Sequence, residues 1–84
     1  MVVNILQKQI NENELIKGIQ DFELEHYQNA YLFMNQETFN ELAIFDPLNV
    51  YIETTNDGSG IVSSYSGRRV FQNEDLKFGE VEII

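Results

Sequence analysis

The sequence predicts a single α+β domain over residues 1–84, with a small mixed or antiparallel sheet of about four to five short strands and two flanking helices. Two stretches of the chain repeat apolar residues at helical spacing, which predicts the helices. Short apolar or alternating runs separated by turn residues predict the strands. A chain of 84 residues can build one modest core, because chains split into several domains only at much greater length.

The clearest stretch runs from an apolar strand into a helix. Tyr31–Met34 contains only apolar and aromatic side chains, which is typical of a short strand covered on both sides, and we expect Leu32 or Phe33 to supply core volume. Asn35 can cap the following helix through its side-chain oxygen. Asp46-Pro47 ends that helix, because the residue before a proline avoids the helical conformation.

An earlier helix is predicted over about Glu12 to Glu25, with Asn11 as its cap. Glu23 falls on the apolar side of this helix. We therefore expect either that the helix frays there or that Glu23 is paired, with His26 as the partner. Residues Met1–Ile10 fit a first helical turn or an edge strand equally well.

The second half of the chain has the pattern of strands. Alternating polar and apolar residues, then an apolar and hydroxyl run, predict a β-hairpin, and two further strands follow. The hairpin consists of Val50–Thr55 and Ile61–Tyr65 around the turn residues Asn56–Gly60, and the later strands are Arg68–Gln72 and Glu80–Ile84.

The composition limits the classes of partner. A formal charge of -9, from 14 acidic and five basic residues, opposes binding to nucleic acid, because affinity for phosphate depends on Lys and Arg. The chain has no cysteine, no signal-peptide pattern and no apolar run long enough for a membrane span, so we expect a cytoplasmic protein without a membrane partner. The acidity either serves solubility or forms a face that binds a basic protein surface.

No catalytic, metal-binding or cofactor-binding residues are expected, and the chain is not predicted to be an enzyme. His26 has no visible nucleophile partner, and Gly58-Ser59-Gly60 lacks the spacing of a nucleophile elbow. Asn56-Asp57-Gly58 lacks the further acids of a calcium loop, and the glycines form no phosphate-binding loop. A small hydrolase using a serine and His26 remains a third option, because catalytic triads are assembled in space.

Two groups of charged residues are candidate contacts to a protein partner. Arg68 and Arg69 are adjacent on a predicted strand and thus face opposite sides. They either neutralise neighbouring acids or bind a partner's carboxylate. Glu14, Asp21 and Glu25 fall on one side of the first helix, where they would form an acidic stripe.

The order of four segments resembles the C-terminal part, the axial domain, of tailed-phage major capsid proteins. These segments are Leu32–Leu42, Asp46, Tyr65–Phe71 and Asp75–Val81. In that family a strand ending in Met/Leu-Asn leads into a helix, a variable hairpin follows, and a further strand and an acidic turn close the domain. The resemblance implies a phage or prophage origin and a small sheet flanked by two helices. With 84 residues there is no room for the arm, loop and spine helix of a complete shell subunit.

The expected function is therefore that of a non-enzymatic, phage-derived protein that acts through protein–protein contacts, as a capsid-related accessory or a self-assembling module. Its partner would be a phage structural protein, a host protein or a second copy, in the host cytoplasm or the virion. The alternative is an acidic inhibitor of a host nucleic-acid-binding or defence protein. A concentrated acidic stripe favours the inhibitor, and scattered acids favour assembly or solubility.

Overall fold

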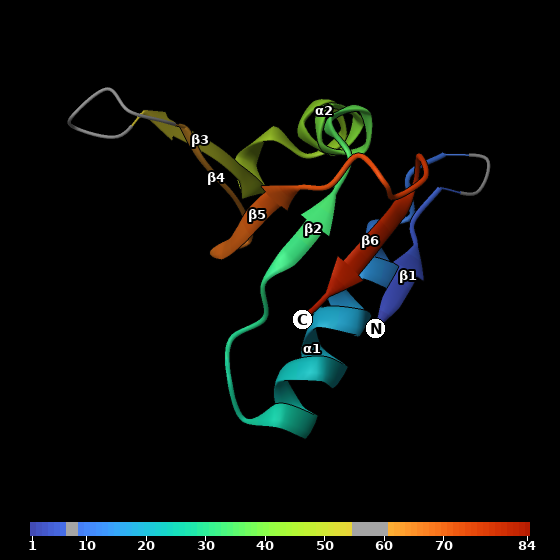
Figure 1. Ribbon diagram of the computed structural model, residues 1–84, viewed down its shortest axis with the longest axis vertical. Coiled ribbons are helices and arrows are strands. Elements are labelled where there is room, and N and C mark those ends of the chain that lie inside the picture. The colour runs from blue at the N-terminus through green and yellow to red at the C-terminus, as the bar shows by residue number, and fades with distance from the viewer. Residues whose placement is uncertain (7–8, 55–60) are drawn as a thin grey trace.

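The structure is a computed structural model that describes residues 1–6, 9–54 and 61–84. It confirms the α+β prediction (Figure 1). The two helices are α1 (Glu12–His26) and α2 (Gln36–Phe45), followed by the 3-10 turn η1 (Pro47–Asn49). The strands are β1 (Val2–Asn4), β2 (Leu32–Met34), β3 (Val50–Thr54), β4 (Ile61–Tyr65), β5 (Arg68–Gln72) and β6 (Glu80–Ile83).

The described strands form one six-stranded mixed sheet in the order β1-β6-β2-β5-β4-β3. Only the β2–β5 pair is parallel. The predicted β-hairpin is present as β3 and β4, while its turn residues Asn56–Gly60 lie outside the described part of the chain. The N-terminal segment, which the sequence left open, is a strand that pairs Val3 with Val81 of β6.

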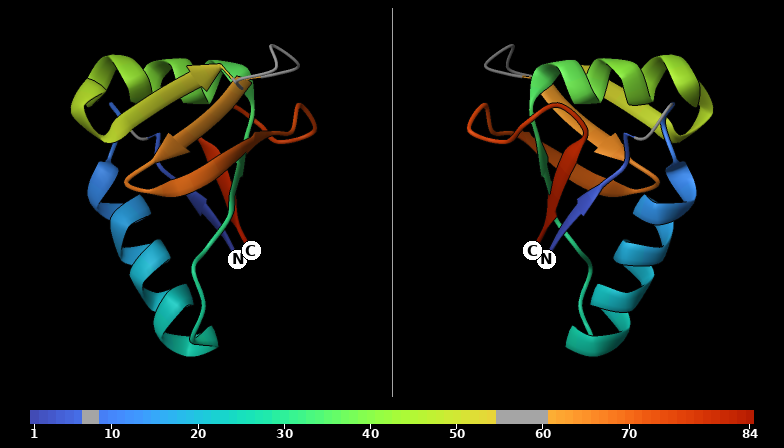
Figure 2. Two further views of the ribbon diagram at one scale, coloured as in Figure 1. Left: turned by 90° about the vertical axis from the view of Figure 1, so that its left-hand side faces the viewer. Right: turned by 90° about the vertical axis from the view of Figure 1, so that its right-hand side faces the viewer.

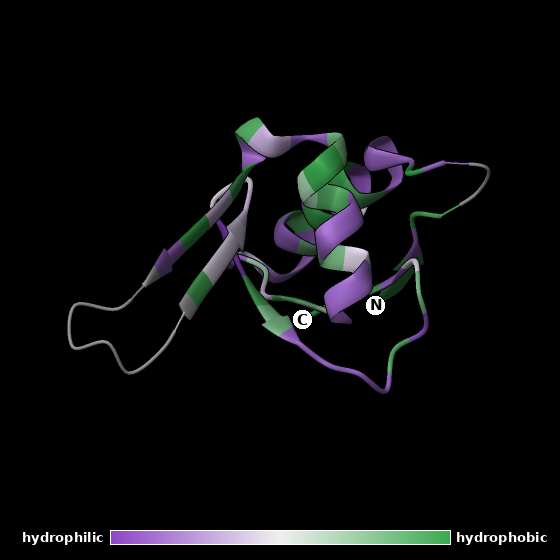
Figure 3. Cartoon of the chain, turned by 90° about the horizontal axis from the view of Figure 1, so that it is seen from above, coloured by the Kyte–Doolittle hydropathy of each residue, from purple (hydrophilic) through white to green (hydrophobic). Residues whose placement is uncertain are grey.

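Both helices pack on one face of the sheet. The register places Leu32 beside Val70 and Ile83, and these three buried side chains belong to the hydrophobic core that includes Leu15 of α1 and Leu42 of α2. The sheet curves around the helices, as the side views and the view from above show (Figures 2 and 3). The opposite face of the sheet has no helix in the described structure and is called the open face below.

Close contact between α1 and the sheet requires a glycine. A Cβ atom at Gly18 would lie 2.9 Å from Ile83 Cδ1 and 3.1 Å from Val3 Cγ1, so the helix lies directly against β6 and β1. Gly79 has φ +90°, and a Cβ atom there would lie 2.5 Å from Leu6 Cβ. The low helix propensity of Gly18 is thus offset by the close packing that it allows.

The two predicted helix caps differ in the structure. Asn35 caps α2 as expected, because its side-chain oxygen accepts hydrogen bonds from Thr38 N at 2.7 Å and from Thr38 Oγ1 at 2.6 Å. Asn11 takes the N-cap position of α1 as predicted, but its side chain makes no capping hydrogen bond. Its backbone carbonyl accepts from Glu14 N instead, at 3.2 Å.

The expectation that β2 is covered on both sides is also wrong. Leu32 and Met34 are buried under the helices, but Phe33 is only half-buried and the preceding Tyr31 is exposed. Successive residues of a strand point to opposite faces, and only one face has a helical layer. β2 therefore contributes aromatic side chains to the open face. Neither described helix is long and apolar enough to cross a membrane.

Candidate functional site

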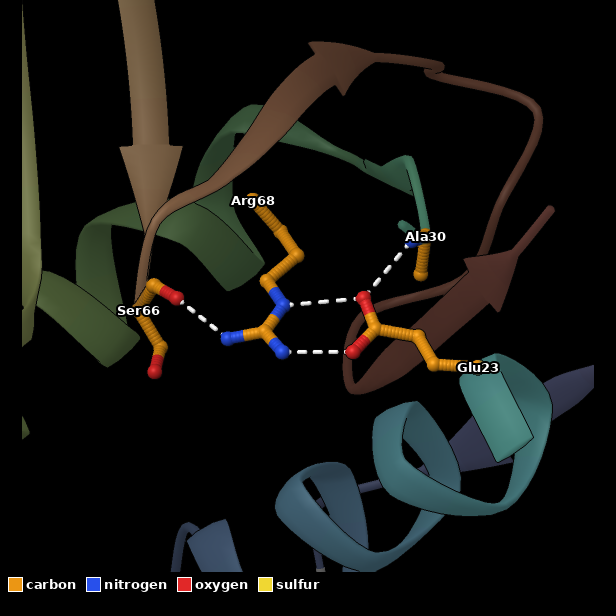
Figure 4. Close-up of polar contacts among 4 residues, drawn as sticks. All are labelled: Glu23, Ala30, Ser66 and Arg68. Carbon is orange, nitrogen blue, oxygen red and sulfur yellow. Dashed lines mark hydrogen bonds and ion pairs between the residues drawn. The ribbon is translucent and has the colours of Figure 1, made fainter. Parts of the chain in front are cut away.

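Arg68 and Arg69 face opposite sides of β5, as predicted, and their surroundings differ. Arg68 points to the helix side, where its Nε donates to Glu23 Oε2 at 3.0 Å and its guanidinium also binds Glu23 Oε1 and the Ser66 carbonyl (Figure 4). Glu23 Oε2 accepts a further hydrogen bond from Ala30 N at 2.8 Å. The Arg68–Glu23 pair thus joins β5 to α1 and to the segment before β2, and the guanidinium of Arg68 is used inside the molecule.

This ion pair corrects the expected partner of Glu23. Helix α1 does not fray at Glu23, and the carboxylate binds Arg68 and not His26. The hydrogen bonds from Arg68 hold the pKa of Glu23 below its usual value, against the opposing effect of burial. His26 stacks on Phe22, and its Nδ1 lies 2.9 Å from the Phe22 carbonyl oxygen.

Arg69 lies on the open face, where it covers an aromatic side chain. Its guanidinium carbon is 4.8 Å from the ring centroid of Phe71. Phe71 stacks on Phe33 of the neighbouring strand, with 5.2 Å between the ring centroids. The ring centroid of Tyr31 lies 6.0 Å from that of Phe71. These four residues, Tyr31, Phe33, Arg69 and Phe71, are called the open-face patch.

The positive charge of Arg69 lies at one side of the open-face patch, and negative charges lie beyond its other side. β6 runs beside β2, and the register places Glu82 opposite Phe33, with Glu80 on the same face one pleat away. Arg69 is on β5, two strands away from β6 and two residues before Phe71, which is level with Phe33 and Glu82. Across the sheet the surface therefore changes from positive through aromatic to negative.

The predicted acidic stripe is exposed, but it is not the only exposed acidic region. Glu14, Asp21 and Glu25 are all exposed on α1, away from the buried residues of that helix. Further exposed acids lie on other elements, namely Glu37 and Glu41 of α2, Glu53 of β3, and Glu74 and Asp75 before β6. The acids of the described residues are thus scattered over the surface, which is the pattern that favours assembly or solubility over the inhibitor.

A groove of about 350 Å³ lies between α2 and strands β3–β5. Phe39, Ile52 and Val70 supply apolar lining, and Gln36 and Gln72 supply amides. Its lining includes neither a carboxylate nor an imidazole, so it offers no acid–base pair for catalysis. Within residues 1–6, 9–54 and 61–84, no three His, Asp or Glu side chains come together to hold a metal ion.

A second polar cluster lies where the start of α1 meets the end of α2. Burial, and then Asp46, raise the pKa of Glu12 above its usual value. Burial also raises the pKa of the Tyr65 hydroxyl, and the buried atoms Glu12 Oε2 and Tyr65 Oη have no hydrogen-bond partner among the residues that the structure describes. No local sequence pattern indicates this cluster, because its members are far apart in the chain.

The open-face patch was only partly visible in the sequence. Arg69 was a candidate contact residue, but its aromatic neighbours come from β2 and β5, which are adjacent only in the folded sheet. No family model, no curated protein and no solved structure matches this chain. The open-face patch and the charges beside it are therefore the observations on which a functional proposal can be based.

Proposed function

We propose that this chain is a non-enzymatic, phage-derived module that binds another protein through the open-face patch, as a capsid-related accessory in particle assembly. It would act in the host cytoplasm or in the virion. The observation that carries the proposal is Arg69, exposed above the stacked rings of Phe71 and Phe33 on a sheet face without a helix. The resemblance of the segment order to capsid axial domains supports the phage context.

The chemistry of the open-face patch fits a protein surface. Aromatic residues and arginine are enriched in the cores of protein interfaces and carry much of their binding energy. The rings of the patch are rigid, and Arg69 is already held above one of them, so little conformational entropy is lost on binding. The partner we expect has an apolar centre, a carboxylate facing Arg69 and a basic group facing Glu80 and Glu82.

Nucleic acid is the competing occupant of such a surface. Aromatic side chains on an open sheet stack on bases in several RNA-binding folds. Here Glu80 and Glu82 lie beside the patch, and a chain of formal charge -9 repels phosphate. The charges thus favour protein over nucleic acid.

The acidic-inhibitor alternative relies on Glu14, Asp21 and Glu25. They form an exposed row on α1, as a mimic of phosphate charges would need. Because the remaining exposed acids are distributed over several elements, the structure does not set this row apart from the rest of the surface. We therefore rank the inhibitor second.

The test is affinity capture from phage-carrying cells, followed by titration of the purified captured protein. Arg69→Ala should weaken its binding by about tenfold or more, as expected for an arginine at the centre of an interface. Lys17→Ala is the matched control, because it removes the same charge from an exposed site on α1. It should bind like the wild type.

Two outcomes would overturn the proposal. If every captured protein binds Arg69→Ala as well as it binds the wild type, the patch is not the site. If binding is lost in a Glu14→Gln, Asp21→Asn, Glu25→Gln variant and kept in Arg69→Ala, the inhibitor alternative takes its place. Single-stranded RNA and DNA oligonucleotides, measured by fluorescence anisotropy at physiological salt, should not bind.

A further inference from the structure

Several exposed apolar side chains are concentrated in one continuous segment of the chain. This segment runs from the end of α2 through η1 into β3, and its exposed large apolar residues are Ile44, Phe45, Leu48, Tyr51 and Ile52. Isolated exposed apolar residues are normal, but a continuous group on a small acidic protein marks a contact surface.

β3 lies at the edge of the sheet and pairs only with β4 among the described strands. The backbone N–H and C=O groups along its outer edge are therefore available to another strand. Natural edge strands are usually protected by charged side chains, especially lysine, by proline or by a bulge, and Val50–Thr54 contains one charged residue, Glu53, but neither lysine nor proline. Tyr51 and Ile52 are each 60% exposed, so each face of this edge exposes a large apolar side chain.

We propose that two copies of this chain pair antiparallel along β3, around a two-fold axis at Ile52, so that their sheets become continuous. Opposed residues lie on the same face of a sheet, so a two-fold pairing must centre on a residue and not between residues. Centring on Ile52 places Ile52 against Ile52, Tyr51 against Glu53 and Val50 against Thr54, and it uses the whole strand.

The charges along this segment favour this register and permit a second copy as the occupant. Centring on Glu53 would oppose two carboxylates, whereas centring on Ile52 places each Glu53 beside a tyrosine of the other copy. Two chains of formal charge -9 repel one another, so contact is favourable only where the surface is close to neutral. From Ile44 to Ile52 the sole charged residue is Asp46, whose carboxylate accepts a hydrogen bond from Asn49 Nδ2.

The groove beside β3 adds to the apolar contact. Ile52 forms part of its lining together with Phe39 and Val70. In the proposed register the Ile52 of the second copy lies next to that of the first, on the groove side of the sheet. The pairing therefore removes apolar lining from water as well as satisfying the backbone of the edge.

The first experiment measures self-association by sedimentation over a wide concentration range. Tyr51→Glu places like charges opposite one another at two positions of the dimer, and Tyr51→Lys places opposite charges there. We expect the dimer of Tyr51→Glu to be weaker than that of Tyr51→Lys by about tenfold or more. The control pair is Leu24→Glu and Leu24→Lys, at an exposed site on α1, where the same change in net charge should alter self-association far less.

The second experiment tests the register by cysteine cross-linking, since the chain has no cysteine of its own. Opposed residues in antiparallel strands have Cα atoms about 4.5–5.5 Å apart, which suits a disulfide. Ile52→Cys should therefore form a covalent dimer rapidly on oxidation. Tyr51→Cys, equally exposed on the same strand, should do so slowly, because its counterpart lies diagonally across the pair.

A wild type that stays monomeric at all concentrations would overturn the proposal, as would faster cross-linking at Tyr51→Cys. If the Glu and Lys variants differ in self-association as much at Leu24 as at Tyr51, the difference comes from net charge alone, which would contradict the register. Melting curves of each variant show that the fold is kept. Tyr31→Ala, which changes the open-face patch at a residue outside the groove lining, should dimerise like the wild type, so failure of this proposal is separable from failure of the open-face proposal.

Discussion

Glu12 shows how a single carboxyl group links two helix ends. It begins α1 beside Asp46, the residue at the end of α2, and close to the hydroxyl of Tyr65. Burial and the neighbouring carboxylate raise the pKa of Glu12 above its ordinary value of 4.5, so the folded protein binds this proton more tightly than the unfolded chain. The resulting stability is fully present below the unfolded pKa and is lost as the pH rises through the folded pKa.

Glu12→Gln should therefore raise the melting temperature at neutral pH. The amide removes a buried charge and supplies donors to Asp46 and Tyr65, a gain of about 1 kcal/mol by the usual value of such hydrogen bonds. The gain should vanish as the pH falls to 4.5, the ordinary pKa of a glutamate, because Glu12 of the wild type is itself protonated there. Thermal melts at a series of pH values test this, with the exposed Glu14→Gln as the control for net charge. A lower melting temperature for Glu12→Gln at pH 7 would contradict the assignment.

For a single residue, the sequence predicts the direction of the side chain better than the residue that it contacts. It showed that Arg68 and Arg69 diverge, since a strand alternates its faces. It could not show that Arg68 meets Glu23, which is 45 residues away, while Arg69 covers Phe71. It also favoured His26 for Glu23 because local helix spacing is the only contact rule that sequence supplies. Which of the two arginines was available on the surface depended on the packing of α1.

The elements differ in how far their local pattern determines them. Both helices were predicted almost to their observed ends, because their apolar spacing and the Asp46-Pro47 stop are local signals. Strand β1 was not predicted, because a strand of three residues is defined mainly by its pairing with β6. The two faces of β2 were misjudged because an apolar run does not show whether a second layer exists to cover it.

The structure now predicts different costs for the two central residues of β2. Leu32 is fully buried between Val70 and Ile83, so Leu32→Ala should lower the free energy of unfolding by about 2–5 kcal/mol, a large part of a small domain's stability. Phe33 is half-buried on the open face, and Phe33→Ala should cost only about 1 kcal/mol, mainly through its lost stacking on Phe71. Denaturant unfolding of both variants measures the difference. An equal or larger loss for Phe33→Ala would show that the open face is covered.

For the whole molecule, the strand order was beyond the reach of sequence patterns. β1 and β6 pair from opposite ends of the chain, and the parallel β2–β5 pair brackets the β3–β4 hairpin. These pairings depend on the burial of one shared core and not on any local spacing. Net charge, by contrast, is fixed by composition, and it makes a prediction for the molecule as a whole.

Added NaCl should raise the melting temperature. The protein carries a formal charge of -9 and measures 35 × 32 × 26 Å, and Arg68–Glu23 is the one ion pair among its described residues. The Debye length is about 30 Å at 0.01 M salt and about 8 Å at 0.15 M, so repulsion acts across the whole molecule in the first case and only between neighbours in the second. Screening therefore favours the compact state over the expanded unfolded chain.

The matched control for this effect is the Glu14→Gln, Asp21→Asn, Glu25→Gln variant, which changes the formal charge from -9 to -6 by removing three carboxylates. It should melt higher than the wild type at low salt and respond less to NaCl. Melts at low protein concentration, in the Tyr51→Glu background, separate this effect from the proposed dimer, which screening would also stabilise. A wild-type melting temperature that falls as NaCl is added would mean that the Arg68–Glu23 pair outweighs the repulsion among 14 acidic residues, and the ion pair, not net charge, would then govern the salt response.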